Sequence, residues 1–247
     1  MTGAAVDAGG RGGEPCGMKV TYYLEVISSW CYWAEPAWAE LQRRYAGRVE
    51  FDWKIALMRK EDYPVSTAQC DWFYRRSGMV MRSPFMLNSA WMEPFREGLF
   101  PAASYVAEAG KDFGVTGDEL RLALAHAADR DGLKVCSMDP AIEVAVKAFE
   151  AGALGATRLR QASARQELRA RAESPEVAAR IKASTAEFFA HQIDQRPAFI
   201  ITSGIGDKAV FSGVPRVEPL AATIESMLAD AAGYAAHKAH YGGVPAK

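Results

Sequence analysis

LEVISSWCYWAEPAWAEL, residues 24–41, joins the end of an apolar stretch to a run with helical periodicity. The stretch begins upstream: residues 19–27, KVTYYLEVI, are rich in β-branched and aromatic residues, which predicts a buried strand. Ser28-Ser29 follow at once, and serine is a favoured N-cap because its hydroxyl accepts from the first free N–H groups of a helix. The segment therefore predicts a strand, a tight turn and a helix that begins near Ser28.

A second strand follows this helix. Residues 49–57, VEFDWKIAL, alternate between apolar and polar, so residues 19–57 are expected to form a βαβ unit with parallel strands. From about residue 66 to 192, apolar residues recur at helical spacing. Asp139-Pro140 and Ser174-Pro175 in this block are typical of an N-cap followed by a first-turn proline.

The chain returns to strands after Arg196-Pro197. AFIITSG, a polar turn at 204–208 and AVFSG predict a β-hairpin, and a final helix is expected over 217–232. The order βαβ, helical block, ββα, with a proline just before the third strand, is the thioredoxin arrangement. We expect an α/β protein with a thioredoxin fold and a large all-helical insertion between its βαβ and ββα halves.

These patterns divide the chain into four parts. The expected parts are a disordered leader (1–17), a thioredoxin-like domain (18–65 and 193–235), an inserted helical domain (66–192) and a tail (236–247).

The composition limits the classes of partner. The 247 residues are 49% hydrophobic and 24% charged, with a formal net charge of -1, which gives no reason to expect nucleic acid or an anionic membrane as a partner. We expect a small-molecule substrate. The leader lacks the apolar run of a signal peptide and no stretch is long enough to span a membrane, so a cytoplasmic location is expected.

The cysteines and histidines indicate neither a disulfide framework nor a metal. Cys16, Cys31, Cys70 and Cys136 lie far apart without a CxxC pair, so reduced thiols are expected. The histidines, among them His191, His237 and His240, show no paired ligand spacing, so no metal site is predicted. Cys70 and Cys136 are expected to be core thiols.

The start of the first helix is the position best suited to chemistry. Free N–H groups and the helix dipole stabilise an anion there, which can lower the pKa of a thiol. Ser28 at the end of the strand or Cys31 in the first turn could therefore act on a sulfur. The ordinary alternatives are that Ser28 is only an N-cap and that Cys31 is a small buried apolar residue.

The same segment resembles the DsbA-type disulfide oxidoreductases, especially the FrnE-like branch, in which Cys-Pro-Trp-Cys-Tyr follows an acidic and two apolar residues. The resemblance places Glu25 at the acidic position, Ser28 at the first cysteine, Ser29 at the proline and Cys31 at the second cysteine. The family's nucleophilic cysteine is therefore absent. Kappa-class glutathione transferases and 2-hydroxychromene-2-carboxylate isomerases, members of the same family, resemble this chain in having serine at the first position. In them the serine hydroxyl donates to the thiolate of bound glutathione.

The resemblance extends over most of residues 18–233 and implies a thiol-binding edge. It implies that Pro197 is a cis-proline and that the backbone of Arg196 pairs with the sulfur-bearing residue of a thiol ligand. Ser29 and Trp30 at the helix start belong to the same expected binding set. Where the isomerases carry an acidic-arginine pair after the last strand, this chain keeps only Arg216. The family resemblance also implies a homodimer.

Three functions remain open. The leading hypothesis is an isomerase or transferase that uses glutathione or another low-molecular-weight thiol on an aromatic or conjugated electrophile, with Ser28 holding the sulfur. The second is disulfide exchange by Cys31 alone, which a strongly depressed thiol pKa would favour. The third is a non-catalytic binding protein, which a cleft filled by side chains beside Ser28 would favour.

Two further groups of residues could line such a cleft. Arginines 75, 76 and 82 could bind a substrate carboxylate, or form a solvated face. An aromatic pocket or a packed core could be formed by Trp30, Tyr32, Trp33, Trp72, Phe73, Tyr74, Trp91 and Phe95.

Overall fold

A computed structural model describes residues 17–92, 101–150, 163–213 and 216–243. The strands of this part are β1 (Lys19–Leu24), β2 (Glu50–Ile55), β3 (Ala198–Thr202) and β4 (Lys208–Ser212). They form one sheet in the order β2-β1-β3-β4, in which β1 and β2 are parallel and β3 is antiparallel to both of its neighbours. The predicted parallel pair and the predicted hairpin are both confirmed.

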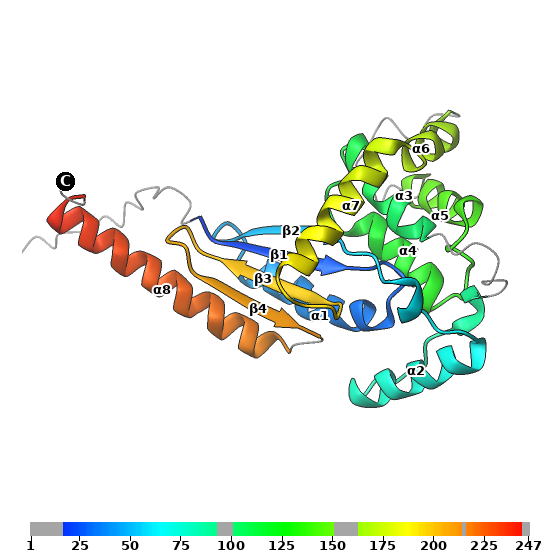
Figure 1. The fold of residues 1–247 in the computed structure, drawn as a ribbon, viewed down its shortest axis with the longest axis horizontal. Coiled ribbons are helices and arrows are strands. Elements are labelled where there is room, and N and C mark those ends of the chain that lie inside the picture. Colours follow the sequence, from blue (N-terminus) through cyan, green and yellow to red (C-terminus); the bar gives the residue numbers. More distant parts are fainter. Residues whose placement is uncertain (1–16, 93–100, 151–162, 214–215, 244–247) are drawn as a thin grey trace, which may run out of the picture.

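The helices surround this sheet at one end and on both faces (Figure 1). They are α1 (Ser29–Arg44), α2 (Thr67–Val80), α3 (Ala102–Gly110), α4 (Glu119–Asp129), α5 (Met138–Glu150), α6 (Ala164–Ala172), α7 (Pro175–Ala190) and α8 (Val217–Tyr241). Short 3-10 turns occur at η1 (Lys60–Asp62), η2 (Ser89–Met92) and η4 (Lys111–Phe113).

Two predicted helix ends are wrong. The helix α5 begins at Met138, so Asp139 lies in its first turn rather than at its N-cap. The helix α8 continues to Tyr241 instead of ending near residue 232, because the alanine-rich sequence beyond that point favours helix without requiring burial. At α7 the predicted N-cap is confirmed, since the Ser174 side chain accepts from the Val177 N–H.

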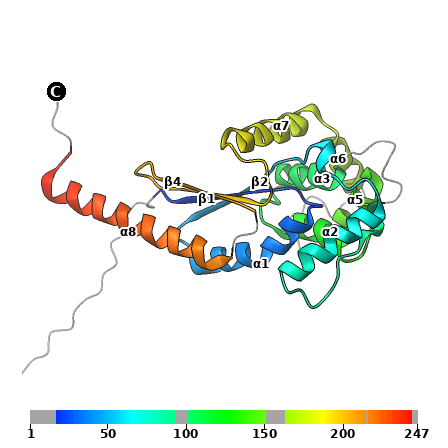
Figure 2. The ribbon, with the colours of Figure 1, turned by 60° about the horizontal axis from the view of Figure 1, so that its bottom comes forward.

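The two faces of the sheet are covered by different helices. Side chains alternate between faces along a strand, so the adjacent residues Tyr22 and Tyr23 point in opposite directions. Tyr22 stacks on Phe199 at 4.7 Å and packs on Trp38 of α1 at 5.1 Å between ring centroids. Tyr23 instead packs on Phe188 of α7. Figure 2 shows α7 on one side of the sheet and α1 with α8 on the other.

The helical block is built around α3. This helix is almost completely buried and packs against α4, α5, α6 and α7. Its alanines, among them Ala103 and Ala107, are small enough to let neighbouring helices approach closely. Although α7 lies within the predicted insertion in sequence, it also covers the sheet, so it joins the helical block to the thioredoxin-like part.

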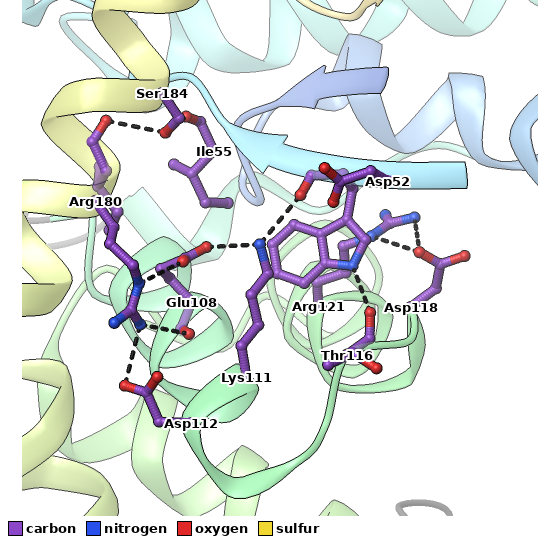
Figure 3. A network of polar contacts seen from close by, with 12 residues as sticks. Asp52, Ile55, Glu108, Lys111, Asp112, Thr116, Asp118, Arg121, Arg180 and Ser184 are labelled. Atoms are coloured by element: carbon purple, nitrogen blue, oxygen red, sulfur yellow. Dashed lines mark hydrogen bonds and ion pairs between the residues drawn. The ribbon is translucent and has the colours of Figure 1, made fainter. Parts of the chain in front are cut away.

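Polar contacts reinforce this joint (Figure 3). Lys111 lies 3.6 Å from the ring centroid of Trp53 in β2, donates to the Trp53 carbonyl and pairs with Glu108 at 2.9 Å. From α7, Arg180 pairs with Glu108, and the Ser184 hydroxyl donates to the carbonyl of Ile55 at 2.6 Å. The end of β2 is therefore held by side chains of the helical block.

A second, buried set of charges joins α1 to α4. Arg121 is 2% exposed and pairs with Glu35 of α1 and with Asp118, the latter at 2.6 Å. Asp118 also accepts from the Trp38 indole N–H at 2.8 Å. Because a buried guanidinium needs such partners, α1 and α4 are fixed relative to each other.

None of the helices in the described part of the chain is long and apolar enough to cross a membrane.

Candidate functional site

The site is built at the start of α1. Ser28 is the N-cap, in extended conformation, and its Oγ accepts from the Cys31 N–H at 3.5 Å. Its own N–H donates to the Glu25 carbonyl, which closes the turn after β1. The Ser28 hydroxyl therefore lies at the positive end of the helix dipole, where it also meets the Cys31 thiol.

Cys31 lies beneath this surface. It is 2% exposed, and burial raises the pKa of its thiol to about 12. A hydrogen bond to Ser28 opposes this shift without overcoming it. The thiol is therefore protonated at neutral pH and shielded, as in the alternative that treats Cys31 as a small buried apolar residue.

Glu25 connects the site to the helical block. Its carboxylate accepts from the Ser104 hydroxyl of α3 at 2.6 Å and from the Met58 N–H at 3.2 Å. Burial raises the pKa of this carboxyl to about 7, against the effect of both donors. Glu25 thus ties the turn before Ser28 to α3 and to the loop after β2.

Arg196 fixes the other side of the site. Its side chain is buried and donates to the carbonyls of Ala56, Leu57 and Asp194. Its guanidinium also lies over the rings of Phe188 and Phe189. The peptide bond to Pro197 is cis. Within the described residues the backbone N–H and C=O of Arg196 make no backbone hydrogen bond. The side chain is therefore structural, whereas the backbone is free for a ligand.

A cleft of about 510 Å³ opens between these two sides. Its lining comes from the start of α1, the loop after β2, α2, the segment around the cis-proline and the end of β4. The lining residues are Ser28, Trp30, Met58, Asp62, Arg76, Asp194, Gln195, Arg196 and Gly213. The cleft is not filled by side chains, which is the condition under which a small ligand can reach the serine.

The structure brings together only some of the predicted site residues. Ser28, Trp30 and Arg196 line the cleft. Ser29 is the first residue of α1 but is not part of the lining, and Cys31 is buried below it. Arg216 is an exposed N-cap residue of α8 outside the lining.

Four of the eight aromatic residues considered for a pocket belong to the core. Tyr32, Tyr74 and Trp91 are buried. Trp33 packs on Phe85 and donates to Ser77. The aromatic-pocket hypothesis is wrong for these four, because their rings fill the space between helices. Trp30 lines the cleft and Trp72 and Phe73 lie near it against Arg76. Phe95, like Cys16 and the leader up to residue 16, lies outside the described residues.

Sequence reasoning missed part of the lining. Met58 and Asp62 follow the carboxyl end of β2, and ligand sites gather at the carboxyl ends of parallel strands. That rule could have found them. Asp194 and Gln195 could have been found by their position just before the proline.

The other candidate groups lie elsewhere. Cys70 is buried and Cys136 is half-buried. His191 Nδ1 lies 2.7 Å from Lys208 Nζ. The rings of His237 and His240 pack on Tyr241. Among the described residues no group of three histidines, cysteines or carboxylates could hold a metal ion.

Sequence comparison gives no relatives: no protein-family model matches the chain. Among curated proteins no match is found either.

Solved structures, in contrast, match over most of the chain. A Nitrosomonas europaea protein, described provisionally as a protein disulfide isomerase, shares 17% identity with a TM-score of 0.67, covering 86% of this chain and 98% of its own. The cytosolic disulfide reductase DsbM from Pseudomonas aeruginosa shares 16% identity with a TM-score of 0.61, covering 85% of this chain and 98% of its own. The structure of DsbM with GSH matches with 15% identity and a TM-score of 0.59, covering 85% of this chain and 98% of its own. At these identities the likeness concerns the fold. The chain has the DsbA-like thioredoxin fold with a helical insertion, as the resemblance of residues 24–41 implied.

Proposed function

We propose that the chain is an enzyme that binds a low-molecular-weight thiol, glutathione or a similar molecule, in the cleft beside Ser28. One observation carries this proposal: the Ser28 hydroxyl caps α1 at the edge of an open cleft, next to the free backbone of Arg196. The thiol-bearing residue would lie along that backbone as an added strand, with its sulfur at the helix start. The structure of DsbM with GSH supports the choice of thiol, because that protein has the same fold.

The residues here favour ionisation of a bound thiol. The helix dipole and the Ser28 hydroxyl would both stabilise the thiolate, and its proton would leave to solvent. The thiolate lone pair would then form a C–S bond to an electrophilic carbon of a conjugated substrate, while the π electrons move toward the activating group. Protonation gives a conjugate. Without protonation, rotation followed by breaking of the C–S bond gives an isomer and releases the thiolate.

The test compares Ser28→Ala with the wild type in calorimetric titrations of the reduced protein with reduced glutathione. We expect saturable binding in the wild type and a dissociation constant raised by roughly 10- to 100-fold in the variant, the scale for one hydrogen bond to a charged group. Thr116→Ala, in the loop before α4 and outside the cleft lining, is the control and should bind like the wild type. Equal binding by Ser28→Ala would contradict the proposal.

Disulfide exchange by Cys31 is the second candidate, because the matching structures include a disulfide reductase. Burial of Cys31 and its raised pKa oppose this function. A reactive cysteine would be a thiolate at neutral pH and accessible to solvent. We therefore rank it below thiol binding at Ser28.

The rate of Cys31 alkylation against pH separates the two candidates. In a variant with Cys16, Cys70 and Cys136 replaced by serine, we expect iodoacetamide to react slowly at pH 7 and faster only well above pH 9. Fast alkylation with a midpoint below pH 7 would favour disulfide exchange instead.

A further inference from the structure

Arg76 is the cation of the cleft that is free to meet a ligand. It lies on α2, lines the cleft together with Ser28, and is exposed. Within the described part of the chain it has no carboxylate partner and no hydrogen bond. The other arginine of the lining, Arg196, uses its guanidinium on backbone carbonyls.

Aromatic rings hold Arg76 in place. Its Cζ lies 5.7 Å from the ring centroid of Trp30, 5.0 Å from that of Trp72 and 5.2 Å from that of Phe73. Rings attract a guanidinium without neutralising its charge or using up its N–H donors. The group is therefore oriented and still able to donate two parallel hydrogen bonds to a carboxylate.

The wall of the cleft opposite α2 carries acidic side chains. Asp62 and Asp194 line that side, and Asp62 is already engaged by the Arg59 N–H and by Arg196 at 3.8 Å. Asp194 is exposed, with no side-chain partner among the described residues. An anionic group in the cleft is repelled from the aspartates and attracted toward α2.

We propose that the cleft selects ligands that carry a carboxylate and that Arg76 binds this carboxylate. This inference rests on the proposed function for the position of the sulfur, but the charge preference stands on Arg76 alone. A role of Arg76 in binding the carboxylate would make α2, and with it the helical insertion, the source of ligand specificity. The carboxylate belongs either to the thiol itself or to the electrophilic second substrate, and binding experiments distinguish the two.

The first experiment compares reduced glutathione with its diethyl ester, in which both carboxylates are neutral. We expect the wild type to prefer glutathione by roughly 5- to 20-fold, and Arg76→Gln to lose most of that preference. Arg76→Lys should restore part of it. Arg75→Gln is the matched control, because Arg75 is the neighbouring exposed arginine, does not line the cleft and donates to the Asp71 carbonyl.

Cinnamate, an unsaturated carboxylate without a thiol, tests the second source. If Arg76→Gln weakens cinnamate binding and leaves the glutathione preference intact, the carboxylate belongs to the electrophile; the reverse result assigns it to the thiol. The proposal is overturned if the wild type binds glutathione no better than its diethyl ester and does not bind cinnamate. It is also overturned if Arg76→Gln changes neither the glutathione preference nor cinnamate binding.

S-methylglutathione separates this inference from the proposed function. Its carboxylates are intact but its sulfur cannot ionise. Binding that depends on Arg76 but is equal for glutathione and S-methylglutathione, and unchanged in Ser28→Ala, would keep the carboxylate site and refute the role of the thiol.

Discussion

The two walls of the cleft are built differently. On the thioredoxin-like side, buried hydrogen bonds of Arg196 and Glu25 hold the cis-proline segment and the turn before Ser28. On the α2 side, Arg76 and Trp72 are exposed, and the Arg76 guanidinium lies over the Trp72 ring. Substitutions in the first wall should therefore change stability and binding together, whereas those in the second should change ligand preference alone.

The largest effect should come from Arg196→Met, which tests whether the first wall is fixed by its buried contacts. The variant leaves the carbonyls of Ala56 and Leu57 without their donors, so the free energy of unfolding should fall by about 4 kcal/mol. Glutathione binding should be lost with it, because the backbone of the cis-proline segment is no longer held. Urea unfolding and calorimetry measure both.

The control for this variant is Arg216→Met. Arg216 is exposed at the N-cap of α8 and lies outside the cleft lining, so its loss should change stability by less than about 0.5 kcal/mol. A change below about 1 kcal/mol for Arg196→Met would show that its contacts do not hold the wall. If Arg196→Met fails to fold, Arg196→Lys, with a smaller expected loss, takes its place.

A smaller, pH-dependent effect is expected from Glu25→Gln. Burial raises the pKa of Glu25 from its ordinary value of 4.5 to about 7. Between these two pH values the folded state holds a proton on Glu25 that the unfolded state has released. The stability contributed by this group is therefore present below pH 4.5 and lost as the pH rises through 7, by about 3 kcal/mol. The variant should lose this part of the pH dependence.

Asp129 provides the comparison for Glu25. It is buried in the helical block, accepts from the Tyr74 hydroxyl at 2.8 Å, and burial raises its pKa to about 8. In Glu25→Gln, stability should still decline with rising pH because of Asp129. Adding Asp129→Asn should remove this remaining decline. Unfolding free energies measured at pH 5, 6, 7 and 8 give both slopes, and an unchanged slope in Glu25→Gln would refute its raised pKa.

The fold could be predicted because local patterns and chain order agree. The strand of residues 19–27, the serine cap and the proline before the third strand each indicate the same arrangement. The end of α8 was missed because alanine-rich sequence carries helix propensity without an apolar face. The dual role of α7 was missed because periodicity shows that a helix has an apolar side but not which element it meets.

The site could be predicted only in part. Ser28 follows from the helix start, and the Arg196 backbone from the proline. That the Arg196 side chain is structural depends on the position of Ala56, 140 residues away in sequence. Likewise, three neighbouring arginines look alike in the sequence, and only the packing of α2 against Trp30 distinguishes Arg76.

The smallest effect on stability should come from Trp72→Ala in the α2 wall. Trp72 is 54% exposed, so its removal should change the free energy of unfolding by no more than about 0.5 kcal/mol. It also removes one of the rings that orient Arg76, which should weaken the preference for glutathione over its diethyl ester by roughly 2- to 3-fold. Met79→Ala is the matched control, because Met79 is 80% exposed on the same helix and does not line the cleft. A loss of stability comparable to that of Arg196→Met would show that the two walls are equally fixed. Preserved stability with a reduced charge preference would mean that ligand selection can change at α2 while the sulfur-binding wall stays intact.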